Sequence, residues 1–380
     1  MRLTLAVALG VFLIPLPARA QSVRVTESLE TLESRTRADS NDAAAHYNLA
    51  MGYWSKKKYG EAERSLRSAI QIEPQFAEAY LALAIVHNWD GDYWKEVRRR
   101  GGDTLLAQTT KEWDRYYRQA FLLDPLVDLK ILGATFRFGG YHDHFRDGLE
   151  NLVEGRYEQA YTHFAEELVF TQGRQPIDSV PEGLIWFRGL AAAHVSKYAE
   201  AAEDYSHLLN RVQLKTESDS TDEVPLEAND YRYMLAVLHQ RMGKTDEALR
   251  LYQQVLENDL GNYMAHVQQA RLYEGMQRFD LAIIERRRAV ETNPDDASLL
   301  LDLGISLGRS GQFEAAMEAL EQSHEMNPRD CRTLFWLGTA AFQLQQHARA
   351  KDAFTRFVGM ASPRFERQIA LARERIREIP

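Results

Sequence analysis

Apolar side chains in the last third of the chain recur at the three- and four-residue spacing of helices that bury one face. From Asn229 to Ser362 this pattern repeats every 34 residues. Two rows of small residues mark the period: Ala236, Ala270, Gly304 and Gly338 in one, and Ala248, Ala282, Ala316 and Ala350 in the other. A fixed period of this length predicts an all-α, right-handed solenoid of about eight stacked helix-turn-helix units, each burying its apolar face against its neighbours.

The unit from Ala297 to Asn327 shows how the first helix of one period is built. Its apolar stripe has helical spacing and consists of Leu299, Leu300, Leu303 and Leu307. Asp295 and Asp296 precede the helix and can cap its free amide groups. Gly311 follows the helix and allows the positive φ that a helix end favours.

The second helix of this unit is expected to begin at Phe313 and to end before Pro328, whose ring and missing amide hydrogen stop a helix. Its predicted inner side consists of Ala316, Leu320 and Met326. Gly304 and Ala316 leave room for the two helices to cross closely. A larger side chain at either site should therefore cost about 1–3 kcal/mol.

Residues that fit the same unit recur at both ends of the array. The first unit carries His46, Leu49, Ala50, Tyr53, Ala62, Leu66, Ala69 and Pro74, and the last carries Leu334, Leu337, Gly338, Ala350 and Phe354. In these residues and in its period the chain resembles the tetratricopeptide repeat family, and its type resembles that of exported bacterial members. The resemblance implies stacked helical hairpins in which the first helix of each unit lines a concave face.

Ligands of that family usually contact positions 2, 5, 9, 12 and 13 of a unit, so the resemblance implies an apolar and aromatic groove for a partner polypeptide. The predicted partner-binding residues are Tyr47, Met51, Leu81, Phe145, Trp186, Tyr233, Val237 and Phe335. The Lys, Asn and Arg side chains with which some members clamp a terminal carboxylate are absent from the matching positions of the first three units. Packing between adjacent repeats is the alternative role for each site, because first helices in such arrays are apolar on two faces.

The first twenty residues have a separate character. Arg2, an apolar run and the small residues of Ala18-Arg19-Ala20 are typical of a secretory signal that is cleaved after Ala20. A retained membrane anchor is the alternative, but the apolar run is shorter than the roughly 20 residues that a spanning helix needs. We therefore expect an exported protein, periplasmic or extracellular, whose mature chain has no membrane span.

The rest of the chain divides into five segments. They are a leading helix or linker at 21–42, an irregular array at 43–209 with insertions at about 88–112, 126–140 and 171–181, a flexible acidic linker at 210–228, four regular units at 229–361, and a capping helix at 362–380. The capping helix begins at Ser362-Pro363 and carries an inner stripe of Phe365, Ile369, Ala372 and Ile376.

The net charge argues against one class of ligand, and the cysteine count limits disulfide bonding. The formal net charge is −9, so we expect no nucleic acid to bind, although the run 98–100 is basic and lies near Trp89 and Trp94. A second basic run, 286–288, is expected on an exposed helix flank. Cys331 is the only cysteine, which excludes an intrachain disulfide and favours a role in packing.

No constellation of residues predicts catalysis, a cofactor or a metal. The chain contains no phosphate-binding glycine loop and no nucleophile elbow. His142 and His144 flank Asp143, but two residues separated in this way on a helix point about 200° apart and do not converge on one ion.

These observations favour a non-enzymatic scaffold that binds a partner segment in its concave groove, with assembly of a bacterial envelope complex as the expected setting. Replacing Tyr47, Trp186, Tyr233 and Phe335 with alanine is predicted to abolish partner capture while the array still folds. The alternative is an enzyme or carbohydrate-binding protein with its site in the insertion region 88–140, around Trp89, Asp90, Asp92 and Trp94. Self-association of the array, giving a homo-oligomer, is a third possibility.

Overall fold

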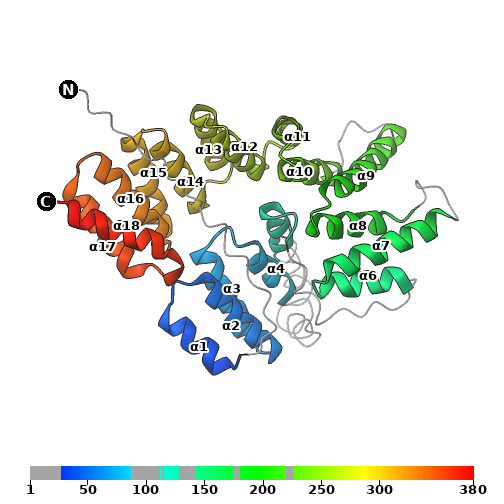
Figure 1. Ribbon diagram of the computed structural model, residues 1–380, viewed down its shortest axis with the longest axis horizontal. Coiled ribbons are helices and arrows are strands. Elements are labelled where there is room, and N and C mark those ends of the chain that lie inside the picture. Colours follow the sequence, from blue (N-terminus) through cyan, green and yellow to red (C-terminus); the bar gives the residue numbers. More distant parts are fainter. Residues whose placement is uncertain (1–26, 87–111, 113–114, 128–142, 174–179, 220–225) are drawn as a thin grey trace, which may run out of the picture.

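The structure is a computed structural model that describes residues 27–86, 112, 115–127, 143–173, 180–219 and 226–380. The described part of the chain contains helices and no strand. The predicted all-α solenoid of stacked helical hairpins is confirmed. The helices from α6 to α18 follow one another around an arc, and α1 to α4 lie across its open side (Figure 1).

Helical pairs correspond to the predicted units. The first half contains α1 (Leu29–Ala38), α2 (Ala43–Ser55), α3 (Tyr59–Ile72), α4 (Ala77–Val86), α6 (Asp143–Val153), α7 (Tyr157–Gln172), α8 (Glu182–His194) and α9 (Tyr198–Asp219). The second half contains α10 (Leu226–Arg241), α11 (Thr245–Asn258), α12 (Tyr263–Gly275), α13 (Phe279–Thr292), α14 (Ala297–Arg309), α15 (Phe313–Met326), α16 (Cys331–Gln343), α17 (His347–Met360), the 3-10 turn Pro363–Phe365 and α18 (Glu366–Glu378). Residues 115–123 are also helical.

The hairpin of α14 and α15 has the predicted local construction. The Asp296 carboxylate accepts a hydrogen bond of 2.9 Å from the Ser298 amide and caps α14. Gly311 has φ of +84°, as the turn requires. A Cβ atom added to Gly304 would lie 2.5 Å from Leu320 Cγ, so the close crossing depends on the glycine.

Two predicted details are wrong. Met326 is 45% exposed, and Ser323 takes the inner position instead, because it follows Leu320 by three residues on the same helical face. The described residues of the predicted flexible linker 210–228 are helical, since α9 continues to Asp219 and α10 begins at Leu226, and 220–225 lie outside the described residues. Val212 is buried, which ties the extension of α9 to the core.

Helices at both ends of the described chain cover the terminal repeats. Ser28 caps α1 through a hydrogen bond of 3.2 Å from the Thr31 amide, and Leu32 of this helix is buried. At the other end Phe365 and Ala372 are buried, and Ile369 and Ile376 pack against the same cluster. The predicted capping helix thus covers the apolar end of the last repeat while its charged residues face water.

Cys331 and Arg286 occupy buried positions. Burial raises the pKa of the Cys331 thiol to about 12, so this side chain is a packing residue with little thiolate character. Arg286 is 3% exposed, which corrects the expectation of an exposed flank. Its guanidinium donates to Glu274 Oε1 at 3.1 Å and to Asp302 Oδ2 at 2.7 Å, and these carboxylates compensate its buried charge.

Candidate functional site

The predicted binding residues differ in accessibility. Met51, Phe145 and Trp186 are half-buried. The others are buried in the structure: Tyr47, Leu81, Tyr233, Val237 and Phe335. Leu81 has no exposed surface, so as a partner-binding residue it is corrected to a core residue. Packing between helices, the alternative left open by the sequence, accounts for this residue.

Aromatic contacts explain why the largest of these side chains are buried. The Tyr47 ring lies 5.2 Å from the Phe76 ring, at the start of the next unit. The Phe335 ring lies 5.2 Å from Phe357 on the second helix of its own unit. Simultaneous replacement of such residues by alanine would therefore remove core contacts. This packing does not support the expectation that the variant with all four residues, Tyr47, Trp186, Tyr233 and Phe335, replaced by alanine still folds.

The inner face of the regular repeats is in contact with the chain's own first repeats. Gln75, in the turn between α3 and α4, donates to Ser298 Oγ at 3.3 Å and accepts from Arg271 at 3.1 Å. Arg364 forms an ion pair of 3.2 Å with Glu73. Asn327 donates to the Gln71 carbonyl oxygen at 2.6 Å. We call residues 71–75 the inner turn.

Two further contacts involve the helical segment 115–123. The Tyr233 hydroxyl donates to the Leu122 carbonyl oxygen at 3.1 Å. The Gln119 amide donates to the Tyr263 hydroxyl at 2.5 Å. Burial raises the pKa of both phenols, to about 12 for Tyr263, so both remain protonated donors or acceptors at neutral pH.

Three of these contacts involve positions of the unit that the sequence predicts to contact a partner. In the register of the units, Ser298 occupies position 2, Tyr233 position 5 and Arg271 position 9. We call these three residues, together with Asn327 and Arg364, the inner wall. Four of its residues donate to carbonyl, amide and carboxylate oxygens of the same chain, and Ser298 accepts from Gln75. The predicted groove is therefore partly filled by the protein itself.

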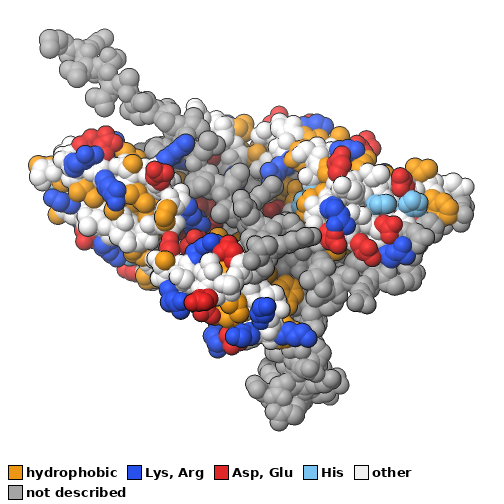
Figure 2. All heavy atoms as spheres, turned by 60° about the horizontal axis from the view of Figure 1, so that its bottom comes forward, with side chains coloured by type: hydrophobic (Ala, Val, Ile, Leu, Met, Phe, Trp, Pro, Cys, Tyr) orange, Lys and Arg blue, Asp and Glu red, His pale blue; other side chains and the backbone are white. Residues whose placement is uncertain are grey.

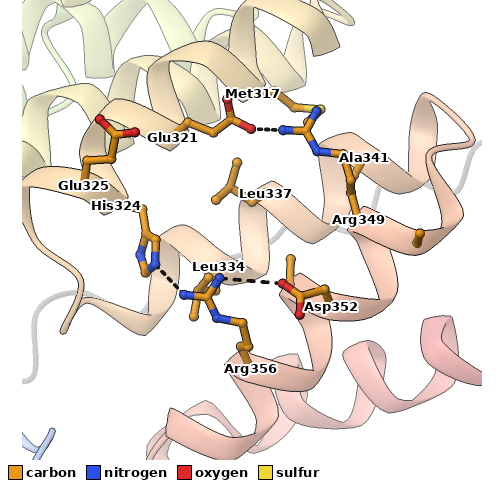
Figure 3. A pocket seen from close by; sticks show the side chains of 12 residues that line it. Met317, Glu321, His324, Glu325, Leu334, Leu337, Ala341, Arg349, Asp352 and Arg356 are labelled. Atoms are coloured by element: carbon orange, nitrogen blue, oxygen red, sulfur yellow. Dashed lines mark hydrogen bonds and ion pairs between the residues drawn. The ribbon is translucent and has the colours of Figure 1, made fainter.

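A separate groove lies between α15 and α17 (Figure 3). It has a volume of about 470 Å³ and an apolar floor of Leu334, Leu337 and Ala341 from α16. Arg349 pairs with Glu321 across the opening, and Arg356 donates to His324 Nε2 at 2.8 Å. Burial, followed by the charge of Arg356, lowers the pKa of His324, so this imidazole is neutral and can accept that hydrogen bond.

The alternative site in the insertion region cannot be placed. Trp89, Asp90, Asp92 and Trp94 lie outside the described residues, as do the basic run 98–100 and His142. Among the described helices, none is long and apolar enough to cross a membrane.

Comparison with known proteins gives one recurrent family. A profile described as "Tetratricopeptide repeat" matches residues 233–297 and 301–364, and a second profile with the same description matches residues 43–76. No curated protein sequence matches the chain.

Similar solved structures are also described as repeat proteins or as MamA. The C-terminal part of a TPR repeat-containing protein from Cytophaga hutchinsonii has 16% identity and a TM-score of 0.49, and the match covers 60% of this chain and 85% of that one. MamA of AMB-1 has 18% identity and a TM-score of 0.38, with 49% and 96% covered. MamA 41-end from Desulfovibrio magneticus RS-1 has 17% identity and a TM-score of 0.38, with 47% and 94% covered.

Proposed function

Because the chain is a tetratricopeptide repeat protein, we propose that it is a non-enzymatic scaffold whose inner wall binds an extended segment of a partner protein. One observation supports this site above others. The inner wall already holds a polypeptide segment, the inner turn, through side chains that donate to backbone and side-chain oxygens. A partner segment would use the same donors after displacing the inner turn.

The donors also indicate the chemistry of the partner. Arg271 and Arg364 present cationic guanidinium groups, and Asn327 presents an amide to a backbone carbonyl. The matching segment exposes its carbonyl oxygens and carries an acidic or amide side chain, as the inner turn does with Glu73 and Gln75. Charge-assisted hydrogen bonds of this kind are stronger than neutral ones and fix the register of a bound chain.

Two matched variants test the inner wall. The release variant carries Glu73→Ala and Gln75→Ala. The wall variant carries Arg271→Ala, Ser298→Ala and Arg364→Ala. The two variants remove the same three self-contacts from opposite sides. Only the release variant keeps the side chains of the inner wall. A peptide selected from a random display library on the release variant should bind it at least tenfold more tightly than it binds the wild type, because less of the wild-type inner wall is accessible.

The wall variant is the control for this experiment, since it opens the same contacts but lacks three of the five side chains of the inner wall. We expect it to bind the selected peptide more weakly than the release variant in a fluorescence polarisation titration. Equal affinities for the two variants would place the peptide elsewhere and refute the inner wall as the site.

The proposal includes export to a bacterial envelope, where the scaffold would assist assembly of a larger complex. The apolar leader and the small residues before Gln21 support it. Expression of the full chain in a Gram-negative host should give a periplasmic protein that begins at Gln21, as read by N-terminal sequencing or intact mass. Recovery of the full-length chain in the cytoplasmic fraction would contradict export.

A further inference from the structure

A cluster of two histidines and one glutamate lies on the hairpin of α6 and α7, away from the inner wall. His144 is in the first turn of α6, and His163 and Glu166 lie three residues apart on α7. One ligand atom of each side chain lies within 4.8 Å of the other two. Figure 2 shows histidine side chains exposed together at the end of the molecule where these helices lie.

The distances within the cluster suit a shared cation. Nδ1 of His144 lies 3.1 Å from Glu166 Oε2, and Nδ1 of His163 lies 3.8 Å from the same oxygen. Around a tetrahedral ion with ligands at about 2.1 Å, ligand atoms are about 3.4 Å apart. Small side-chain rotations would therefore bring all three atoms onto one ion.

The surroundings of the His163 imidazole are a second observation in favour of a metal site. Its Nδ1 atom is shielded from solvent, and it has no hydrogen-bond partner among the described residues. A buried imidazole nitrogen without a partner loses the hydrogen bond that water would give it, at a cost of about 1–3 kcal/mol. A metal ion between the two helices would give this nitrogen a ligand bond.

The backbone that carries the three side chains is fixed by core packing. Phe145 and Phe164 directly follow the two histidines, and their rings pack 5.8 Å apart. Phe164 is fully buried, and a Cβ atom added to Gly148 would lie 2.5 Å from its ring. The hairpin therefore holds the ligand-bearing residues opposite each other before any ion arrives, which favours binding.

We propose that His144, His163 and Glu166 form a binding site for a divalent transition metal ion, with Zn²⁺ as the best-fitting ion. Two imidazoles and one carboxylate suit zinc and its neighbours in the first transition series, whereas Ca²⁺ and Mg²⁺ prefer oxygen ligands. Three protein ligands leave a fourth position for water. The bound ion would tie α6 to α7.

The test is calorimetric titration of the tag-free, EDTA-treated protein with ZnCl₂ at pH 7.5. We expect one high-affinity equivalent, and at least tenfold weaker binding in each of His144→Ala, His163→Ala and Glu166→Gln. His347→Ala removes an exposed histidine on α17 and should leave the affinity unchanged. MgCl₂ in place of ZnCl₂ should give no comparable binding.

Folding of the variants is checked by circular dichroism, and Glu166→Gln changes the side chain least. The melting temperature of the wild type should rise with Zn²⁺, because an ion that binds only the folded state stabilises it, and the rise should shrink in the three variants. Unchanged zinc affinity in all three, or an equal loss in His347→Ala, would overturn the site and assign binding to other histidines.

Discussion

Replacement of Arg286 by methionine should lower the free energy of unfolding by about 3–5 kcal/mol, the usual cost of leaving buried charges without their partner. The Arg286 side chain is 4% exposed and lies between Glu274, at 9%, and Asp302, at 21%. Methionine fills much of the same volume but donates no hydrogen bond. Glu274 keeps a hydrogen bond of 2.6 Å from Ser306 and an ion pair of 3.8 Å with Arg309, and these compensate only part of its charge.

The direction in which the pKa of Arg286 shifts agrees with a stabilising network of this side chain with Glu274 and Asp302. Burial alone would lower the pKa of Arg286, but the charges of Asp302 and Glu274 outweigh burial and raise it. A base whose pKa is higher in the folded state stabilises the fold at every pH at which it is charged in the unfolded chain. The contribution is thus present throughout the neutral range.

Urea unfolding monitored by circular dichroism measures the effect of Arg286→Met. Arg287→Met is the matched control, because Arg287 is the exposed neighbour on the same helix, and it should change stability by less than about 0.5 kcal/mol. Adding Glu274→Gln to the Arg286 variant removes one carboxylate charge that is then only partly compensated, and it should restore part of the loss. Equal stability of the two arginine variants would show that the buried ion pairs contribute nothing net.

Replacement of Gly304 by leucine is the second change with a large expected effect. A Cβ atom at this position would lie 2.5 Å from Leu320 Cγ, 2.8 Å from Leu320 Cδ2 and 3.3 Å from the Ala316 carbonyl oxygen. The backbone oxygen cannot move away without displacing α15. We expect a loss of about 3 kcal/mol, at the upper end of the range for an overpacked core.

Gly359 offers a matched control on α17, since nothing lies within 4 Å of a Cβ atom added there. Gly359→Leu should be neutral or stabilising by up to about 1 kcal/mol, because leucine is the better helix former. A compensating variant, Gly304→Leu with Leu320→Ala, exceeds the wild-type volume by only one methyl group and should recover most of the loss in urea unfolding. Lack of recovery would show that the clash involves the backbone more than Leu320.

Hydrogen exchange adds a local measurement to this series. In a repeat array each unit contacts mainly its neighbours, so disruption at one crossing weakens the nearby units first. The amides of α14 and α15 should exchange faster in Gly304→Leu, and those of α6 and α7 should change little. Uniform loss of protection along the chain would mean that the array unfolds as one unit.

The local features of each unit could be predicted from the sequence because they depend on neighbours close in the chain. The cap at Asp296, the turn at Gly311 and the small residues at the crossing act within one hairpin, over a few helical turns. Met326 was misplaced because its angular position, not its apolar character, decides which side it faces.

Arg286 and the His144 cluster show where sequence reasoning fails. Arg286 belongs to a basic run, and such runs usually lie on exposed faces. Only the fold brings Glu274 and Asp302, from two neighbouring helices, to its guanidinium. The sequence predicts no metal site from His144 and His142, of which His142 lies outside the described residues, whereas the residues that converge with His144 are on α7. The i, i+3 spacing of His163 and Glu166 was the available signal.

The sequence by itself determined the helical hairpin, its period and the closure of the array at both ends, because these depend on periodic apolar positions and on caps. The tertiary structure decided what fills the inner wall. Arg271 meets Gln75 across 196 residues, and Arg364 meets Glu73 across 291. Each repeat is rotated slightly relative to the one before it, and these rotations add up around the whole arc. Contacts between distant repeats depend on this total rotation, which cannot be read from the sequence of any single repeat.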